Sequence, residues 1–391
     1  MSEMEIELAK KLTINYLDTQ GNKLAEPYIT TVPNKKYSVV SPEIAGYMPI
    51  KDIIEGELTE DTELTVEYYA ICNDLAFTGL DSNGNETEDE AGIASYTVSG
   101  IGNCNNPKVA IPKEYNGKSV TQIKAKAFSS NSTIQGLVIP STIEAVGTEA
   151  FYGSTGLKEV NINSKNISYI MFCGCTNLEK VIIGENVESI ANRAFDRCAK
   201  LSDVTIQSES TKLFSNAANS FNGCSLLKNF KVNENNNSYK TIDGVLYSID
   251  GTKLIKYPTA KDDVEYIIPS NVTTIASGAF GYTKLEKINI PSTIEEVGAE
   301  AFYGSTGLKE VNINLKNISY IMFCRCTNLE KVIIGENVES IAERAFDSCT
   351  KIVQLTYLGT IEEWNNIVKG KTWKQNTGIE KIVCSDGTIT L

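Results

Sequence analysis

Residues 140–198 read PSTIEAVGTEAFYGSTGLKEVNINSKNISYIMFCGCTNLEKVIIGENVESIANRAFDRC, and residues 291–349 repeat this stretch almost letter for letter. We name these stretches the first copy and the second copy. They differ only at the aligned pairs Ala145/Glu296, Thr148/Ala299, Ser164/Leu315, Gly174/Arg325, Asn192/Glu343 and Arg197/Ser348. So complete a duplication favours a repeated scaffold, because an active site rarely occurs in two identical copies on one chain.

A shorter repeat runs within and around both copies. Each unit begins at a phenylalanine, passes through a cysteine or small residue and a leucine, and ends in a strand-like Val-x-Ile segment. The phenylalanines are Phe128, Phe151, Phe172, Phe195, Phe221, Phe280, Phe302, Phe323 and Phe346. Their spacing is roughly two dozen residues, a length at which one unit cannot bury its own apolar face and must stack on neighbours. The pattern therefore predicts a solenoid.

The consensus of the unit, Ile-x-x-Ile-(x)-x-x-Ala-Phe-x-x-Cys-x-x-Leu-x-x-Val-x-Ile, resembles the BspA-type leucine-rich repeats of bacterial and protozoan surface proteins. The resemblance covers residues 93–391, and its last part, residues 357–391, is similar to the closing segment of that family. It implies an α/β leucine-rich-repeat solenoid, right-handed, with a parallel sheet on one face and short helical or irregular turns opposite.

Residues 12–70 read differently from the repeats. LTINYLDTQGNKL alternates apolar and polar residues and turns between Asp18 and Gly21, as expected for short β-strands. This stretch resembles a mucin-binding-protein (MucBP) repeat, on Tyr16, Asp18, Gly21, Pro27, Gly46, Tyr47 and residues 66–69. The resemblance implies a small β-rich, β-grasp-like domain that acts as a binder or a stalk spacer.

We expect four regions along the chain. They are a MucBP-like β domain at residues 1–70, a linker with an N-terminal capping hairpin at residues 71–110, repeats at residues 111–356, and a C-terminal cap at residues 357–391. The capping hairpin is expected because an open first rung would expose apolar edges. A hairpin insert at residues 233–258 interrupts the repeats, and its Asp250-Gly251 pair is a strong signal for a two-residue turn.

Charge and composition exclude several classes of function. The net charge of −13 would repel a nucleic-acid backbone, and no apolar run of about 18 residues is present to span a membrane. Histidine is absent, which removes Ser-His-Asp and Cys-His catalysis and imidazole-ligated metals. We therefore expect no catalytic residue, cofactor or metal, no nucleic-acid partner and no membrane insertion.

Five of the ten cysteines occupy the same position in successive units: Cys175, Cys198, Cys224, Cys326 and Cys349. One interpretation is a stack of buried free thiols. The other is a set of disulfides or a metal site between rungs, since adjacent strands lie about 4.8 Å apart and disulfide Cα separations of about 4.4–6.8 Å overlap that spacing. A calcium loop starting at Asp81 is excluded, because Glu86 stands where glycine is required and Gly92 where glutamate is required.

The strands of the repeats present two rows of outward-facing positions. The first row, our candidate binding face, is Val138, Asn161, Ile182, Thr205, Lys231, Ile267, Asn289, Asn312 and Ile333. The second row alternates in charge over much of its length: Glu159, Lys180, Asp203, Asn229, Glu265, Lys287, Glu310 and Lys331. One interpretation is cross-strand pairing worth a few tenths of a kcal/mol per pair, which fixes register. The other is a shallow binding surface for a protein or a glycan.

These features and the resemblance lead us to expect a non-enzymatic bacterial cell-surface or secreted protein. The leading hypothesis is an adhesin-like monomer that binds host or neighbouring-cell macromolecules, such as a matrix protein or a mucin-like glycan, through the repeat sheet face. One alternative is a structural spacer without a ligand, and another is glycan recognition by the N-terminal domain. MSEMEIELAKKL lacks the order of a signal peptide, so we expect an export signal to have been removed.

Overall fold

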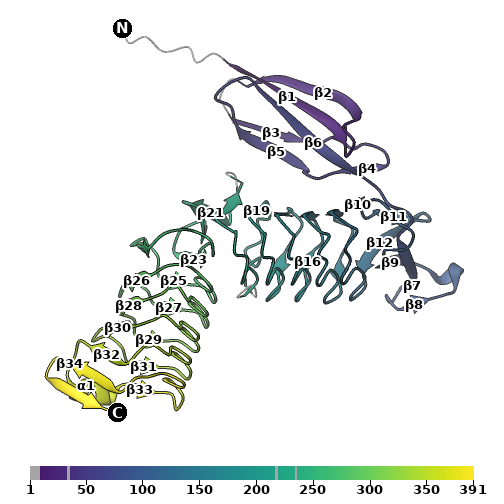
Figure 1. Cartoon of the computed structure of the whole chain (residues 1–391). Helices are drawn as coiled ribbons and strands as arrows, with labels where there is room; N and C mark the ends of the chain where they lie inside the picture. The colour runs from purple at the N-terminus through teal and green to yellow at the C-terminus, as the bar shows by residue number, and fades with distance from the viewer. Residues whose placement is uncertain (1–8, 33–35, 216–218, 234–235) are drawn as a thin grey trace, which may run out of the picture.

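The computed structural model describes residues 9–32, 36–215, 219–233 and 236–391. Figure 1 shows a small β domain near the N-terminus, a first solenoid arm beneath it, and a second arm that turns away from the first. We name these parts the N-terminal domain (residues 10–70), the first arm (residues 108–232) and the second arm (residues 265–391). The first copy lies in the first arm and the second copy lies in the second arm.

Strands alone build the described part of the N-terminal domain. They are β1 (Lys10–Asp18), β2 (Lys23–Val32), β3 (Lys36–Val40), β4 (Tyr47–Pro49), β5 (Ile53–Glu57) and β6 (Thr62–Ala70). Strand β1 pairs antiparallel with β2 and parallel with β6, β4 adds to β6, and β3 pairs with β5. Alternate residues point inward, which buries Leu12, Ile14 and Val66. Residues 9–32 and 36–70 hold no helix, so a β-grasp-like topology is not confirmed.

A second sheet stands at the start of the first arm. It comprises β7 (Ala76–Leu80), β8 (Glu86–Thr87), β9 (Ser95–Gly100), β11 (Glu114–Tyr115) and β12 (Lys118–Ile123), with a 3-10 turn, η1, at Glu90–Gly92. Strands β7 and β9 are antiparallel, with Phe77 opposite Val98. A disulfide between Cys72 and Cys104 joins the residue stretch before β7 to the loop after β9.

The first arm carries one six-stranded parallel sheet, β10-β13-β15-β17-β19-β20. Its strands are β10 (Lys108–Ala110), β13 (Gly136–Ile139), β15 (Glu159–Ile162), β17 (Lys180–Ile183), β19 (Asp203–Ile206) and β20 (Asn229–Val232). Shorter strands β14 (Ala145–Val146), β16 (Asn166–Ile167) and β18 (Ser189–Ile190) lie along a second side of the rungs. Every second residue of the main sheet enters the core, as the Val-x-Ile pattern predicts.

An antiparallel meander joins the arms: β21 (Tyr239–Ile242), β22 (Val245–Ser248) and β23 (Lys253–Lys256). The second arm then repeats the architecture in a separate main sheet of β24 (Glu265–Tyr266), β26 (Lys287–Ile290), β28 (Glu310–Ile313), β30 (Lys331–Ile334), β32 (Gln354–Tyr357), β34 (Lys381–Cys384) and β35 (Gly387–Thr390). Its shorter strands are β25 (Thr274–Ile275), β27 (Glu296–Val297), β29 (Asn317–Ile318), β31 (Ser340–Ile341) and β33 (Val368–Lys369). The solenoid therefore has two sheets rather than one continuous face.

Stacked phenylalanines form the spine of each arm. Phe128 and Phe151 lie with ring centroids 4.9 Å apart, and the stack continues at similar spacing to Phe221. A second stack runs from Phe280 to Phe346. Each ring is buried by the rung above and below, which is why a single unit could not be stable alone.

The five aligned cysteines are free thiols and belong to this spine. Cys175 donates its S–H to the Phe151 carbonyl oxygen at 3.1 Å, and Cys349 donates to that of Phe323 at 3.0 Å. Cys198, Cys224 and Cys326 repeat the contact. Burial raises the pKa of Cys175 and of Cys224 to about 12, so both thiols stay protonated and remain donors. The free-thiol interpretation fits this ladder, and no disulfide links the rungs.

The turns opposite the sheet are not helical. A left-handed residue lies two positions before the phenylalanine, as at Glu149 (φ 60°), and another lies two positions after it, as at Gly153 (φ 65°). Left-handed backbone interrupts an α-helix at both sides of the ring. The helical turns implied by the family resemblance are therefore not confirmed, and the described chain is a β-solenoid with one short α-helix.

That helix, α1 (Ile361–Asn366), belongs to the cap of the last rung. It is held by a capping box, in which the Thr360 hydroxyl accepts from the Glu363 N–H and the Glu363 carboxylate accepts from the Thr360 N–H. Trp364 and Trp373 are buried, and Trp373 packs edge-on against the final spine ring, Phe346. Both tryptophans therefore seal the end of the solenoid.

Candidate functional site

The N-terminal domain rests on the main sheet of the first arm (Figure 1). Met48 and Tyr69 of the domain form a buried apolar cluster with Ala110 and Val138 of the sheet. The approach is so close that a Cβ on Gly136 would lie 2.5 Å from the Tyr69 hydroxyl oxygen. Only glycine fits at this position of β13.

Charged groups surround the apolar cluster. The Lys108 ammonium lies 2.8 Å from a Glu67 carboxylate oxygen and 3.3 Å from one of Glu159, and the Tyr69 hydroxyl donates to Glu159. Burial raises the pKa of Tyr69, and the Glu159 carboxylate raises it further, so this phenol stays protonated as a donor. Burial opposes the charge of Lys108, but the two carboxylates outweigh that effect and raise its pKa. The lysine therefore bridges the domain and the arm as a cation.

Asp52 forms the second polar contact between domain and arm. Its carboxylate accepts from the Asn163 side-chain amide at 2.6 Å and from that of Asn161 at 3.4 Å. Both asparagines are almost fully buried. Buried amide groups need hydrogen-bond partners, so Asp52 accepts from side-chain donors of the sheet that would otherwise be buried without one.

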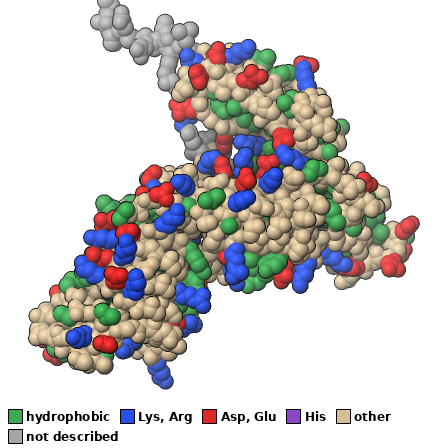
Figure 2. Space-filling view, viewed as in Figure 1, with side chains coloured by type: hydrophobic (Ala, Val, Ile, Leu, Met, Phe, Trp, Pro, Cys, Tyr) green, Lys and Arg blue, Asp and Glu red, His purple; other side chains and the backbone are tan. Residues whose placement is uncertain are grey.

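Beyond these contacts the domain and the arm separate and enclose a cleft of about 850 Å³. Its floor is the outward face of β15, β17, β19 and β20, and its other wall is formed by β3, β5 and β6. Figure 2 shows this hollow between the two parts, with basic and acidic side chains gathered at its mouth. The cleft is the candidate functional site.

Acidic and basic groups alternate across the cleft floor. Lys231 pairs with Asp203, whereas Glu159 faces Lys108 and Tyr69. Lys180, between these two positions in the sheet, is exposed and makes no ion pair with any described residue. The floor also offers the apolar side chain of Ile182 and the hydroxyl of Thr205. This mixture suits an extended, partly polar ligand.

The structure divides the nine residues of the candidate binding face into three groups. Val138 and Asn161 are buried under the N-terminal domain. Ile182, Thr205 and Lys231 line the cleft. The remaining four lie in the second arm: Ile267, Asn289, Asn312 and Ile333. Ile267 is 83% exposed, just after β24.

The sheet of the second arm faces no other part of the described chain. Its charged row forms a ladder in which Lys287 lies 3.9 Å from Glu265 and 3.5 Å from Glu310, and Lys331 lies 3.1 Å from Glu310. Cross-strand pairing therefore operates here. In the first arm, Glu159 instead pairs with Lys108. Asn312, the counterpart of Asn161, has a buried side-chain oxygen without a hydrogen-bond partner among the described residues.

Sequence reasoning missed the docking of the N-terminal domain. Asp52, Tyr69 and Lys108 lie outside the repeat, and no periodicity pointed to them. The sequence signal that could have indicated the docking is Gly136. It occupies the position in β13 at which the next two strands carry the charged residues Glu159 and Lys180. A glycine in a strand often marks a close approach of another segment.

Neither a metal centre nor a membrane span stands out in the described residues. They contain no cluster of three or more Cys, Asp or Glu arranged to hold a metal ion. None of their helices is long and apolar enough to cross a membrane.

Comparison with known families accounts for most of the chain. A model described as the BspA type leucine rich repeat region (6 copies) matches at residues 101–219, 163–255 and 260–368, and the MucBP domain matches at residues 11–69. No curated protein matches the chain.

Several solved structures of bacterial leucine-rich-repeat proteins are similar to the chain. A leucine rich cell surface protein from Faecalibacterium prausnitzii is 22% identical, with 75% of this chain and 96% of that one covered and a TM-score of 0.43. The pneumococcal vaccine antigen PcpA is 20% identical, with 80% and 98% covered and a TM-score of 0.45. A leucine-rich repeat protein from Eubacterium ventriosum is 20% identical, with 70% and 77% covered and a TM-score of 0.47. On the family matches, the chain belongs to the BspA-type leucine-rich repeat family and carries a MucBP domain at its N-terminal end.

Proposed function

We propose that this protein is a non-enzymatic, adhesin-like surface protein that binds an extended segment of an extracellular protein or glycan in the cleft between the N-terminal domain and the first arm. The observation that carries the proposal is the cleft of about 850 Å³, which two differently built modules line together. Grooves between modules are common ligand sites. Three residues of the candidate binding face, Ile182, Thr205 and Lys231, lie on its floor.

A location outside the cytoplasm has two sources of support. One of the similar solved structures is that of a leucine rich cell surface protein from Faecalibacterium prausnitzii. The disulfide between Cys72 and Cys104 is independent of that likeness, because disulfides persist in oxidising compartments and are rare in the cytosol. We therefore place the protein at the cell surface or in the medium, as a monomer with the four regions described above.

The test fills the cleft without altering the fold. Thr205→Trp would place an indole on the floor, and Thr356→Trp is its matched control at the equivalent position of the open sheet in the second arm. Both proteins and the wild type are measured by biolayer interferometry against extracellular-matrix proteins and mucins. We expect Thr205→Trp to weaken binding at least about tenfold, through loss of the shape complementarity that affinity requires. The control is expected to retain wild-type affinity.

The opposite pattern of binding by these two variants would place the binding site outside the cleft. If Thr356→Trp weakens binding and Thr205→Trp does not, the open sheet of the second arm is the adhesive face. If residues 1–70 on their own bind mucin with full affinity, the N-terminal domain is the glycan-binding module and the cleft does not contribute to binding. Absence of any binding by the wild type would favour a structural spacer.

A further inference from the structure

The chain contains four arginines, and all lie in the turns opposite the main sheets: Arg193, Arg197, Arg325 and Arg344. Arg193 and Arg344 each form two hydrogen bonds to the aspartate three residues later, Asp196 and Asp347. Arg197 and Arg325, in contrast, make no ion pair with any described carboxylate. They stand at positions where the two copies differ, because the second copy has Ser348 in place of Arg197 and the first has Gly174 in place of Arg325.

Both unpaired arginines belong to one column of residues, two positions after each spine phenylalanine. Glycine is the commonest residue in this column, at Gly153, Gly174, Gly223 and Gly304, and serine stands at its two ends, Ser130 and Ser348. The exceptions near the joint between the arms are Arg197, Tyr282 and Arg325. A Cβ on Gly223 would lie 3.3 Å from the Arg197 Cα, and a Cβ on Gly304 would lie 3.1 Å from the Tyr282 ring. Small residues thus leave room for the three large side chains.

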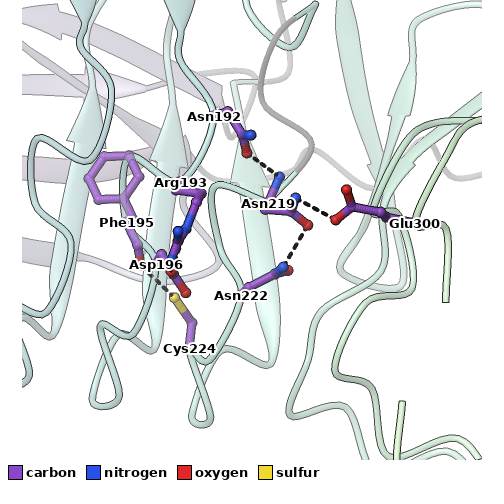
Figure 3. Close-up of polar contacts among 8 residues, drawn as sticks. All are labelled: Asn192, Arg193, Phe195, Asp196, Asn219, Asn222, Cys224 and Glu300. Atoms are coloured by element: carbon purple, nitrogen blue, oxygen red, sulfur yellow. Dashed lines mark hydrogen bonds and ion pairs between the residues drawn. The ribbon is translucent and has the colours of Figure 1, made fainter. Parts of the chain in front are cut away.

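At the joint, a turn of the first arm contacts a turn of the second. Figure 3 shows the contact: Asn219 of the first arm donates its side-chain amide to Glu300 of the second at 2.8 Å, donates its backbone N–H to Asn192 at 3.1 Å, and accepts from Asn222 at 2.7 Å. The Asn219–Glu300 bond links the two arms, and the bonds to Asn192 and Asn222 fix the position of Asn219 within the first arm. We name the surface formed there by Arg197, Tyr282, Tyr303 and Arg325 the inner corner.

Aromatic and cationic groups are interleaved in the inner corner. The rings of Tyr282 and Tyr303 lie 5.7 Å apart, and the Arg325 guanidinium lies 5.7 Å from the Tyr303 centroid. Tyr282 is 42% exposed. Arg197 reaches the joint through its backbone N–H, which donates to the Asn222 carbonyl oxygen at 2.7 Å, and a Cβ on Gly281, next to Tyr282, would lie 3.3 Å from the Asn222 side-chain oxygen. Burial, Tyr303 and Asp196 raise the pKa of Tyr282, while Arg325 and Arg197 oppose that rise. The corner therefore offers two free cations around an exposed aromatic face, on a chain whose net charge is −13.

We propose that the inner corner is a second binding site, separate from the cleft, for an anionic oligosaccharide. Arginine recognises carboxylate and sulfate groups with paired N–H donors. Tyrosine rings supply a flat apolar face on which the C–H surface of a sugar ring packs. Two arginines without carboxylate partners beside the exposed ring of Tyr282 match a sugar that carries a carboxylate, as in sialic acid, or a sulfate. An acidic peptide would satisfy the arginines but would leave the tyrosine faces open.

The duplication supplies variants that the fold already tolerates. Arg197→Ser and Arg325→Gly each install the residue found at the same position of the other copy, and Tyr282→Gly installs the commonest residue of the column. The control is Lys165→Ala with Lys316→Ala, an equivalent pair in the two copies whose ammonium groups are exposed and lie 3.8 Å and 3.2 Å from Glu188 and Glu339. This control removes the same amount of positive charge away from the corner.

The experiment measures the full-length chain by isothermal titration calorimetry with 3′-sialyllactose and with a heparin-derived hexasaccharide, and lactose serves as the neutral probe. We expect saturable binding of at least one anionic probe that weakens as salt rises, and none of lactose. The Arg197→Ser/Arg325→Gly variant should raise Kd at least about tenfold and Tyr282→Gly several-fold, with the lysine control unchanged. Failure of both anionic probes to bind, equal loss in the lysine control, or tighter binding of a polyglutamate peptide would each overturn the proposal.

Discussion

The main sheets of the first and second arms share two identical strands and yet meet different surroundings. Strands β15 and β17 have the same residues as β28 and β30, but the N-terminal domain covers part of the first pair and leaves the second pair open. The difference arises next to the copies, at three structurally equivalent positions. Where the first arm has Lys108, Gly136 and Val138, the second has Glu265, Lys287 and Asn289. We name the asparagine pair common to both arms, Asn161 and Asn163 in the first and Asn312 and Asn314 in the second, the polar half-site. Its presence is therefore not sufficient for docking.

The largest effect is expected from exchanging the residue that makes room for Tyr69. Gly136→Lys would force a side chain into the 2.5 Å gap beside the Tyr69 hydroxyl and place an ammonium in an apolar cluster. We expect a cost of about 3 kcal/mol or more, which undocks the N-terminal domain. Small-angle scattering would register this as an increased radius of gyration. Lys287→Gly, the reverse exchange in the second arm, should leave that radius unchanged, and an unchanged radius in Gly136→Lys would show that other contacts hold the domain.

The joint between the arms contains a buried lysine that provides the next test. Lys256 is almost fully buried, and its ammonium donates to the Gly278 carbonyl oxygen at 2.6 Å. Burial lowers its pKa to about 8. Between pH 8 and the ordinary value near 10.5, the unfolded chain binds more protons than the folded chain, so stability should rise with pH. The gain across this window is about 3 kcal/mol.

Lys256→Met should remove that pH dependence and stabilise the protein at pH 7 by about 2 kcal/mol. Denaturant unfolding at pH 7 and pH 10 measures both effects. Lys253→Met is the matched control, since Lys253 is exposed in the same strand, and it should show neither. A wild-type rise in stability that persists in Lys256→Met would assign the pH dependence to other groups.

The polar half-site gives a smaller effect. Asn163→Ala removes the donor that lies 2.6 Å from Asp52, and a lost hydrogen bond to a charged group costs about 2 kcal/mol. We expect faster amide hydrogen exchange in residues 47–57, which contact the sheet through Asp52. Asn314→Ala, at the equivalent position of the second arm, should leave exchange in this segment unaltered. Equal protection in both variants would mean that the apolar cluster alone fixes the domain.

The two arms also show which features could be predicted from the sequence and which could not. Rung spacing, strand positions and the buried spine follow from the recurrence of phenylalanine and Val-x-Ile, because burial on a stacked rung repeats with the sequence. Asn161 and Asn312 have the same neighbours in sequence, but only Asn161 meets Asp52. Such a contact depends on a docked domain, which no local pattern encodes. The resemblance implies helical or irregular turns, and those of the described rungs are irregular, because left-handed residues interrupt a helix beside the phenylalanines, as Glu149 and Gly153 do on either side of Phe151.

Cysteine pairing shows the same limit. The register of the five aligned cysteines made disulfides between rungs one interpretation of the sequence. The disulfide in the structure instead joins Cys72 and Cys104, which lie outside the repeat. The thiols in register donate instead to the carbonyl groups of the preceding rung. Their equal spacing reflects this hydrogen bond, since the donor must recur wherever the phenylalanine recurs.

The smallest effect is expected at the aligned pair Gly174 and Arg325. Both residues have a left-handed backbone, but one copy has glycine there and the other has arginine. Gly174 has φ 75° and Arg325 has φ 63°, and a left-handed conformation costs a non-glycine residue about 1–2 kcal/mol. Glycine loses more backbone entropy on folding, which offsets part of that cost. We therefore expect Arg325→Gly to stabilise and Gly174→Arg to destabilise, each by about 0.5–1 kcal/mol, in denaturant unfolding. Changes of the same sign in the two variants would show that side-chain contacts, such as that of Arg325 with Tyr303, outweigh backbone conformation at this position.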